Sequence, residues 1–164
     1  QKGPKMPLMM HKLSEAGHIS PACELMLKDE AARELKQIKE RKEIAELLHS
    51  VIIELNRECE RGALLVVEGR RDQLALQSLG LRATCFWLSN KGFSNFLNSA
   101  ESSKKVILLL DYDRKGRYMF ARATRILQSK RIPTDGYYRK AIKKVTKGEI
   151  VHIEQMLMYS AFLA

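Results

Sequence analysis

Two apolar segments, each ending in acidic residues, most constrain how this chain can fold. Residues 64–69 read Leu-Leu-Val-Val-Glu-Gly, and residues 106–113 read Val-Ile-Leu-Leu-Leu-Asp-Tyr-Asp. Open α/β sheets commonly build their sites at the carboxyl ends of buried strands. If the two strands lie side by side, Glu68, Asp111 and Asp113 meet in one crevice.

The remaining pattern places these two strands in an α/β protein. Short apolar runs alternate with helical stretches, which is typical of a parallel sheet with helices on both faces. We therefore predict about four parallel strands between helices. The predicted strands are residues 63–67, 81–88, 105–110 and 132–137; the helices are 25–60, 73–79, 93–98, 117–130, 139–145 and 150–162.

Residues 1–60 are predicted to form a tail and a long amphipathic helix ahead of the α/β domain, which spans residues 61–164. No proline or glycine occurs from residue 25 to residue 60, and apolar residues recur there near heptad spacing. Such a stripe either packs on its own domain or forms a coiled-coil arm or a surface for a protein partner.

The positive charge of the chain is concentrated in the part that carries the acidic motifs. Residues 1–60 hold 10 Lys/Arg against 11 Asp/Glu, whereas residues 61–164 hold 19 against 8, a net of +11. Such asymmetry favours a polyanionic partner, with a generically basic surface as the alternative.

The three carboxylates suit a divalent cation. Asp111 and Asp113 are two residues apart, a spacing that puts both side chains on one face of an extended strand. Together with Glu68 they would repel one another without a cation. Because all the ligands are oxygens, we expect Mg²⁺ or Mn²⁺, with a phosphate-bearing substrate completing the coordination.

Glycines and cations surround the predicted acidic site. Gly69 and Gly116 permit tight turns and close approach of the backbone to phosphate. Asp72 is expected to cap the helix that follows the first motif, with an ion pair to one of the neighbouring arginines as the alternative. Basic residues are expected to contact nucleic acid from the two turns, from the 89–92 loop and from a basic helix: Arg70, Arg71, Lys91, Arg114, Lys115, Arg117, Arg139, Lys140, Lys143 and Lys144.

Other chemistries have no support in the sequence. The cysteines are odd in number with no CxxC pair, which argues against disulfides and structural zinc and fits a reducing cytoplasm. The histidines show neither ligand spacing nor a serine or cysteine partner. No apolar run approaches the ~20 residues of a membrane span. The cysteines are Cys23, Cys59 and Cys85, and the histidines are His11, His18, His49 and His152.

The motif pair resembles a Toprim domain, the catalytic α/β module of topoisomerases, bacterial-type primases, OLD-family nucleases and 5S rRNA-maturation ribonucleases. That pattern is an apolar strand ending in Glu-Gly, then one ending in Asp-x-Asp with a glycine nearby. Residues 66–69 and 109–113 match it, and the resemblance spans about residues 61–157. The small stand-alone Toprim proteins and the 5S-maturation ribonucleases fit best.

The resemblance implies metal-assisted cleavage, joining or synthesis of a phosphodiester. Glu68 would act as general acid/base, and Asp111 and Asp113 would bind Mg²⁺. Lys115 stands where topoisomerases commonly place a further acid, which puts a strong two-metal site in doubt. The 164 residues lack room for the additional domains of topoisomerases and primases.

Three functions stay open at this stage. The first is Mg²⁺-dependent, nuclease-like processing of structured RNA, with ribosomal RNA as one substrate. The alternative is a non-catalytic RNA- or ribosome-binding module of a ribonucleoprotein, with residues 25–60 contacting a protein partner. The third is a role in DNA repair or priming.

Overall fold

The computed structural model describes residues 17 and 19–163, except for the side chains of Asn90 and Lys91. Helix α2 (Pro21–Glu60) confirms the long helix expected over residues 25–60. The chain divides into two compact units at Glu40 and Arg41, so α2 contributes to both. None of the described helices combines the length and apolar character that crossing a membrane requires.

A four-stranded parallel sheet forms the centre of the second unit, which confirms the predicted α/β class. Its order is β2-β1-β3-β4, and all neighbouring strands are parallel. Val67 pairs with Leu109, so the two acidic motifs leave the sheet side by side. The strands are β1 (Ala63–Val67), β2 (Phe86–Trp87), β3 (Lys105–Leu109) and β4 (Thr134–Asp135).

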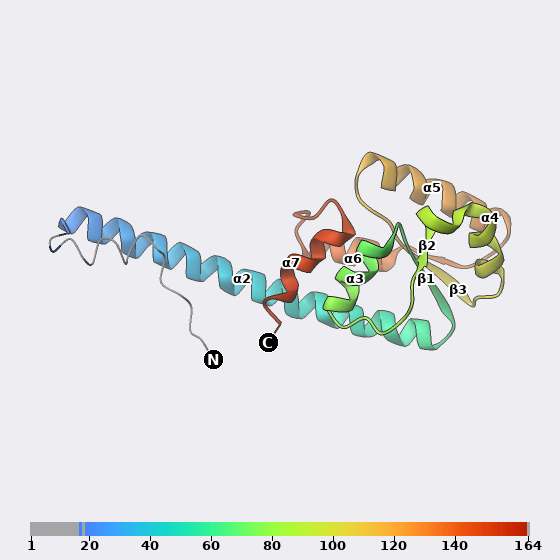
Figure 1. Ribbon diagram of the computed structural model, residues 1–164, viewed down its shortest axis with the longest axis horizontal. Coiled ribbons are helices and arrows are strands. Elements are labelled where there is room, and N and C mark those ends of the chain that lie inside the picture. The colour runs from blue at the N-terminus through green and yellow to red at the C-terminus, as the bar shows by residue number, and fades with distance from the viewer. Residues whose placement is uncertain (1–16, 18, 164) are drawn as a thin grey trace. The chain divides into compact units, whose positions relative to one another are not determined.

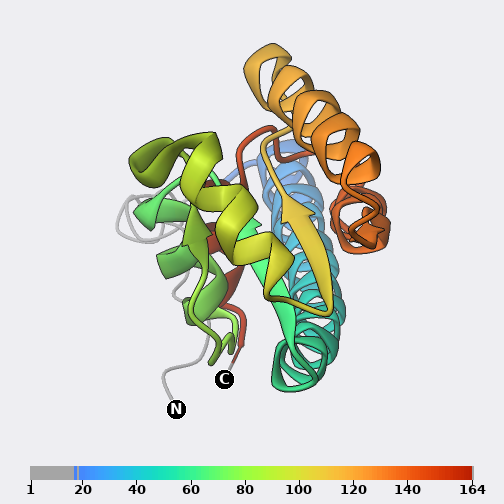
Figure 2. The same cartoon turned by 90° about the vertical axis from the view of Figure 1, so that its right-hand side faces the viewer.

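Helices cover both faces of this sheet (Figures 1 and 2). Alternate residues of β1 and β3 point to opposite faces, as the strand period of two requires. Val67 and Leu109 pack with the C-terminal part of α2, α3, α6 and the C-terminal segment, whereas Val66 and Leu108 pack with α4 and α5. The helical elements are α3 (Arg70–Ser78), α4 (Leu88–Glu101), α5 (Arg114–Ser129), α6 (Tyr137–Val145), the 3₁₀ helix η1 (Ile153–Met156) and α7 (Leu157–Ser160).

The strand predicted over residues 81–88 is mostly wrong, because only two of its residues pair in the sheet. The backbone of the preceding residues bonds to helix side chains instead. The Arg82 N–H donates to Asn56 Oδ1 at 2.8 Å, and the Cys85 N–H donates to Gln73 Oε1 at 3.0 Å. These side chains accept hydrogen bonds from backbone N–H groups that would bond to a neighbouring strand if β2 were longer.

Other element boundaries also differ from the predicted ones. Helices α3 and α5 each begin three residues early, because their caps are Gly69 and Asp113. The expected loop at residues 89–92 lies inside α4, which is kinked at Gly92 with a φ of 69°. The last strand keeps only two residues, and the helix expected over residues 150–162 is shortened to η1 and α7.

Candidate metal-binding site

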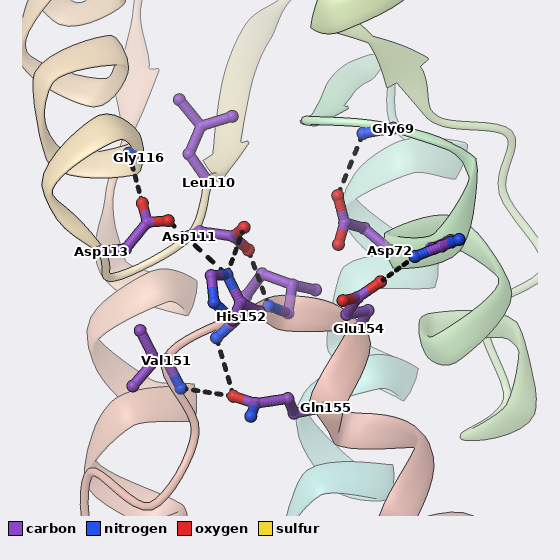
Figure 3. Close-up of polar contacts among 12 residues, drawn as sticks. Gly69, Asp72, Leu110, Asp111, Asp113, Gly116, Val151, His152, Glu154 and Gln155 are labelled. Atoms are coloured by element: carbon purple, nitrogen blue, oxygen red, sulfur yellow. Dashed lines mark hydrogen bonds and ion pairs between the residues drawn. The ribbon is translucent and has the colours of Figure 1, made fainter.

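Asp111 is the buried centre of the candidate site. It lies two residues after the end of β3, and both of its carboxylate oxygens have partners from the C-terminal segment. Oδ1 accepts the backbone N–H of Ile153 at 2.7 Å, and Oδ2 lies 3.0 Å from His152 Nδ1 (Figure 3). The hydrogen bond to Asp111 raises the pKa of His152.

Asp113 completes a group of three residues that could hold a metal ion. As the N-cap of α5 it accepts the Gly116 N–H through Oδ1 at 2.7 Å, while Oδ2 lies 3.7 Å from His152 Nδ1. One ligand atom each from Asp111, Asp113 and His152 fall within 4.8 Å of one another. Figure 3 shows both aspartates directed toward the histidine.

Glu68 follows the neighbouring strand β1, and it lines a pocket that Asp111 also lines. Its Oε1 is buried and has no hydrogen-bond partner among the described residues. Burial, reinforced by the nearby Asp111 carboxylate and partly offset by Lys115, raises the pKa of Glu68 to about 7. Glu68 lies outside the three-residue ligand group, so its role as a ligand stays a prediction.

These acids lie in or beside a pocket of about 380 Å³ whose rim is basic. The exposed side chains of Arg70, Arg71 and Lys115 line it, and Arg71 Nη1 lies 3.9 Å from Glu154 Oε2. The pocket thus brings together acids that follow β1 and β3 and charged residues of α3, α5 and η1. Its lining residues are Glu68, Gly69, Arg70, Arg71, Asp72, Ser89, Asp111, Lys115, Met119 and Glu154.

Asp72 has the expected capping role, but from inside the helix. It is buried in the first turn of α3 and accepts the Gly69 N–H through Oδ2 at 3.0 Å. Burial raises the pKa of Asp72 to about 6. Asp72 therefore shapes the turn that follows Glu68.

Arg139 is partly buried against the Asp111 turn, whereas it was expected to be exposed on a basic helix. Its Nε donates to the carbonyl of Leu110 at 2.9 Å, and its Nη2 donates to the carbonyl of Asp111 at 2.7 Å. The guanidinium also lies 4.7 Å from the ring centres of both Tyr112 and Phe120. With its donors engaged in this way, Arg139 holds the backbone of the Asp111 turn.

The other predicted nucleic-acid contacts lie around the pocket or away from it. Arg114 and Arg117 are exposed at the start of α5, and Lys140, Lys143 and Lys144 are exposed on α6. Their role in binding nucleic acid stays a prediction. The side chain of Lys91 lies outside the described residues.

His152 is the site residue that sequence reasoning missed. It lies 41 residues after Asp111, and no local spacing relates the two. The Tyr112 N–H donates to the carbonyl of Val151 at 2.7 Å, which brings the C-terminal segment to the end of β3. This long-range contact, together with the Ile153 N–H that donates to Asp111, puts the imidazole beside the carboxylates.

The fold and the site define an α/β protein with a potential metal-binding group at the carboxyl edge of a parallel sheet. The chain belongs to the UPF0292 family. It is 37% identical to the family protein of Thermococcus onnurineus, covering 56% of this chain and 69% of the relative. For Thermococcus gammatolerans the identity is 34%, covering 64% and 77%.

A solved structure supports the same fold assignment. A protein of Aquifex aeolicus is 31% identical and matches with a TM-score of 0.56, covering 65% of this chain and 94% of its own. No family model matches the chain.

Proposed function

We propose that this chain is a Toprim-type protein that carries out metal-dependent phosphodiester chemistry on nucleic acid. The observation that carries the proposal is the juxtaposition of Glu68, Asp111 and Asp113 with a basic pocket rim. Carboxylates that bind a metal ion, next to basic side chains that bind phosphate, suit a phosphodiester substrate. Nuclease-like processing of structured RNA is the reaction that we propose.

The residues present fit a divalent cation. The donor set is dominated by carboxylates, and Glu68 Oε1 is a buried oxygen without a hydrogen-bond partner among the described residues. Asp111 and Asp113 would hold Mg²⁺ or Mn²⁺, with Glu68 and His152 beside them. When bound, such an ion supplies charge neutralisation and Lewis-acid activation at phosphate.

Glu68 would move the proton in this reaction. Burial raises the pKa of its carboxyl group to about 7, and a cation bound beside it would lower that pKa toward the carboxylate form, which accepts protons. It can therefore accept a proton from an attacking hydroxyl or donate one to a leaving oxygen. Arg70, Arg71 and Lys115 would bind the flanking phosphates through charge-assisted hydrogen bonds.

A non-catalytic RNA- or ribosome-binding module is the second candidate. The observation that favours it is that both carboxylate oxygens of Asp111 already have partners within the chain. The acids could then stabilise the turn while the net charge of +11 over residues 61–164 binds RNA.

Cleavage assays on matched substrates test the catalytic proposal. Structured RNA, single-stranded RNA and duplex DNA are incubated with the protein in Mg²⁺ or Mn²⁺. We expect metal-dependent cleavage of RNA that falls at least ~100-fold in Glu68→Gln, since general acid/base catalysis contributes 10²–10⁴-fold. Glu60→Gln, which changes an exposed glutamate outside the pocket, serves as the control.

The outcomes separate the two candidate functions. Equal cleavage by wild type and Glu68→Gln, or no cleavage with either metal, would reject the catalytic proposal. Salt-dependent RNA binding that persists in Glu68→Gln without any turnover would favour the binding module. Cleavage of DNA alone would redirect the proposal to a role in DNA metabolism.

A further inference from the structure

The imidazole of His152 lies where a third metal ligand would stand. Its Nδ1 is 3.0 Å from Asp111 Oδ2 and 3.7 Å from Asp113 Oδ2. Adjacent ligands of an octahedral ion with bonds of about 2.1 Å are separated by about 3 Å, and opposite ones by about 4 Å. The two separations from Nδ1 lie in the range that ligands of one ion would show, and one ligand atom from each of the three residues lies within 4.8 Å of the others.

The backbone around His152 holds this position through several contacts. Gln155 Oε1 accepts the N–H groups of Val151 and His152 at 2.7 and 2.9 Å (Figure 3). On the next residue, the Ile153 N–H donates to Asp111 Oδ1 at 2.7 Å. These hydrogen bonds fix the segment to the turn that carries Asp111, a preorganisation that favours ligand sites.

We infer that His152 is a nitrogen ligand that makes this site selective for Mn²⁺ over Mg²⁺. Mg²⁺ binds oxygen ligands almost exclusively, whereas first-row transition ions accept imidazole nitrogen as well as carboxylate. An Asp-Asp-His group thus favours Mn²⁺ more than three carboxylates would. The inference rests on the metal site of the proposed function and specifies its ion.

A purely hydrogen-bonding role for His152 predicts a different result. An imidazole that only orients Asp111 would strengthen the binding of both ions to a similar extent. An imidazole that coordinates the ion strengthens Mn²⁺ binding selectively. His152→Asn separates the two roles, because an amide still donates a hydrogen bond to Asp111 but offers oxygen instead of an imidazole nitrogen.

The matched comparison is Asp113→Asn. Asparagine still caps a helix well, so α5 is kept while a shared carboxylate ligand is lost. This change removes negative charge that attracts both ions. It should therefore weaken Mn²⁺ and Mg²⁺ binding together.

Calorimetric titration of the full chain with MnCl₂ and MgCl₂, in the absence of nucleic acid, measures the selectivity. We expect the Mn²⁺/Mg²⁺ affinity ratio to fall at least ~10-fold in His152→Asn, the lower end of the effect of altering a metal's ligand environment. In Asp113→Asn both affinities should fall by a similar factor, so their ratio should stay nearly unchanged. Electron spin echo spectra of bound Mn²⁺ should show modulation from a ¹⁴N nucleus, and this modulation should disappear in His152→Asn.

Two results would overturn the inference. One is an unchanged affinity ratio in a folded His152→Asn protein, with folding checked by circular dichroism. The other is bound Mn²⁺ without ¹⁴N modulation in the wild type. Selective Mn²⁺ binding without cleavage of any nucleic acid would instead reject the catalytic function and leave this inference standing.

Discussion

Replacing Gly116 by alanine should displace the turn that carries Asp111. A Cβ atom at position 116 would lie 2.2 Å from the carbonyl oxygen of Asp111 and 2.6 Å from its carbonyl carbon. Ordinary van der Waals contact begins at 3.4 Å, so the helix or the turn must move by about 1.2 Å. The glycine is thus required for close packing of two backbone segments.

The size of the effect follows from opposing contributions. Alanine in place of glycine stabilises a helix by up to about 1 kcal/mol. Overpacking against a backbone costs about 1–3 kcal/mol. The Asp111 carbonyl also accepts a hydrogen bond from Arg139 at 2.7 Å, and weakening that bond costs about another 1–2 kcal/mol. We expect Gly116→Ala to lower the free energy of unfolding by about 2 kcal/mol.

Gly69→Ala is the matched control, because Gly69 occupies the equivalent turn after β1. A Cβ there would meet Ser89 Oγ at 3.4 Å, and its φ of −160° suits any residue. Its effect in urea denaturation should stay within about 1 kcal/mol. Equal stability of the two variants, with Mn²⁺ affinity unchanged in Gly116→Ala, would refute the steric argument.

Three further changes test other parts of the molecule. Arg139→Gln should lower the free energy of unfolding by about 2–3 kcal/mol in urea denaturation, because two charge-assisted bonds to carbonyls are lost. Lys140→Gln, at an exposed position, should change it by less than about 0.5 kcal/mol. Equal effects of the two substitutions would contradict the role of Arg139 in holding the Asp111 turn. The pKa of Glu68 is raised from 4.5 to about 7, so wild-type stability should fall as pH rises through this window. Glu68→Gln should remove this pH dependence, so at pH 8 its free energy of unfolding should exceed that of the wild type by about 1 kcal/mol, a value reduced to allow for solvent screening. If the free energies of unfolding of the two proteins change with pH in parallel, the effect is excluded. Lys105 Nζ lies between the carboxylates of Glu58 in α2 and Asp135 in β4, at 2.7 and 3.1 Å. Lys105→Met should therefore lower the free energy of unfolding by about 1–2 kcal/mol, and by less at high salt. A loss that does not change with salt would indicate that packing, not charge, is responsible.

The central strands could be predicted because their signal is local. Residues 63–67 and 106–110 are apolar and each run ends at an acidic residue, as expected for strands that are buried on both faces and end at an exposed edge. The lengths of β2 and β4 could not be predicted in this way. Asn56 lies 26 residues before Arg82, and its side chain takes a backbone donor that a strand would have used.

The acidic part of the site was predictable for the same reason. Parallel strands that are neighbours in the sheet bring Glu68 and Asp111 together once β1 and β3 pair. Arg139 shows the limit of reasoning from charge. The sequence locates a cation on a basic helix, but the two carbonyls and two aromatic rings that surround it come from packing.

Asp111 connects the architecture of the sheet to the chemistry that we propose. Arg139 holds its carbonyl, the backbone of Gly116 packs against that carbonyl, and Ile153 and His152 hold its carboxylate. Its position therefore depends on contacts from α5, from α6 and from the segment that begins η1. Because the side chain is already ordered, ion binding would not have to order it, so less of the binding free energy is lost to conformational entropy. In the proposed metal site, cation selectivity would then depend on the atoms that face the ion, which makes the nitrogen of His152 the informative one.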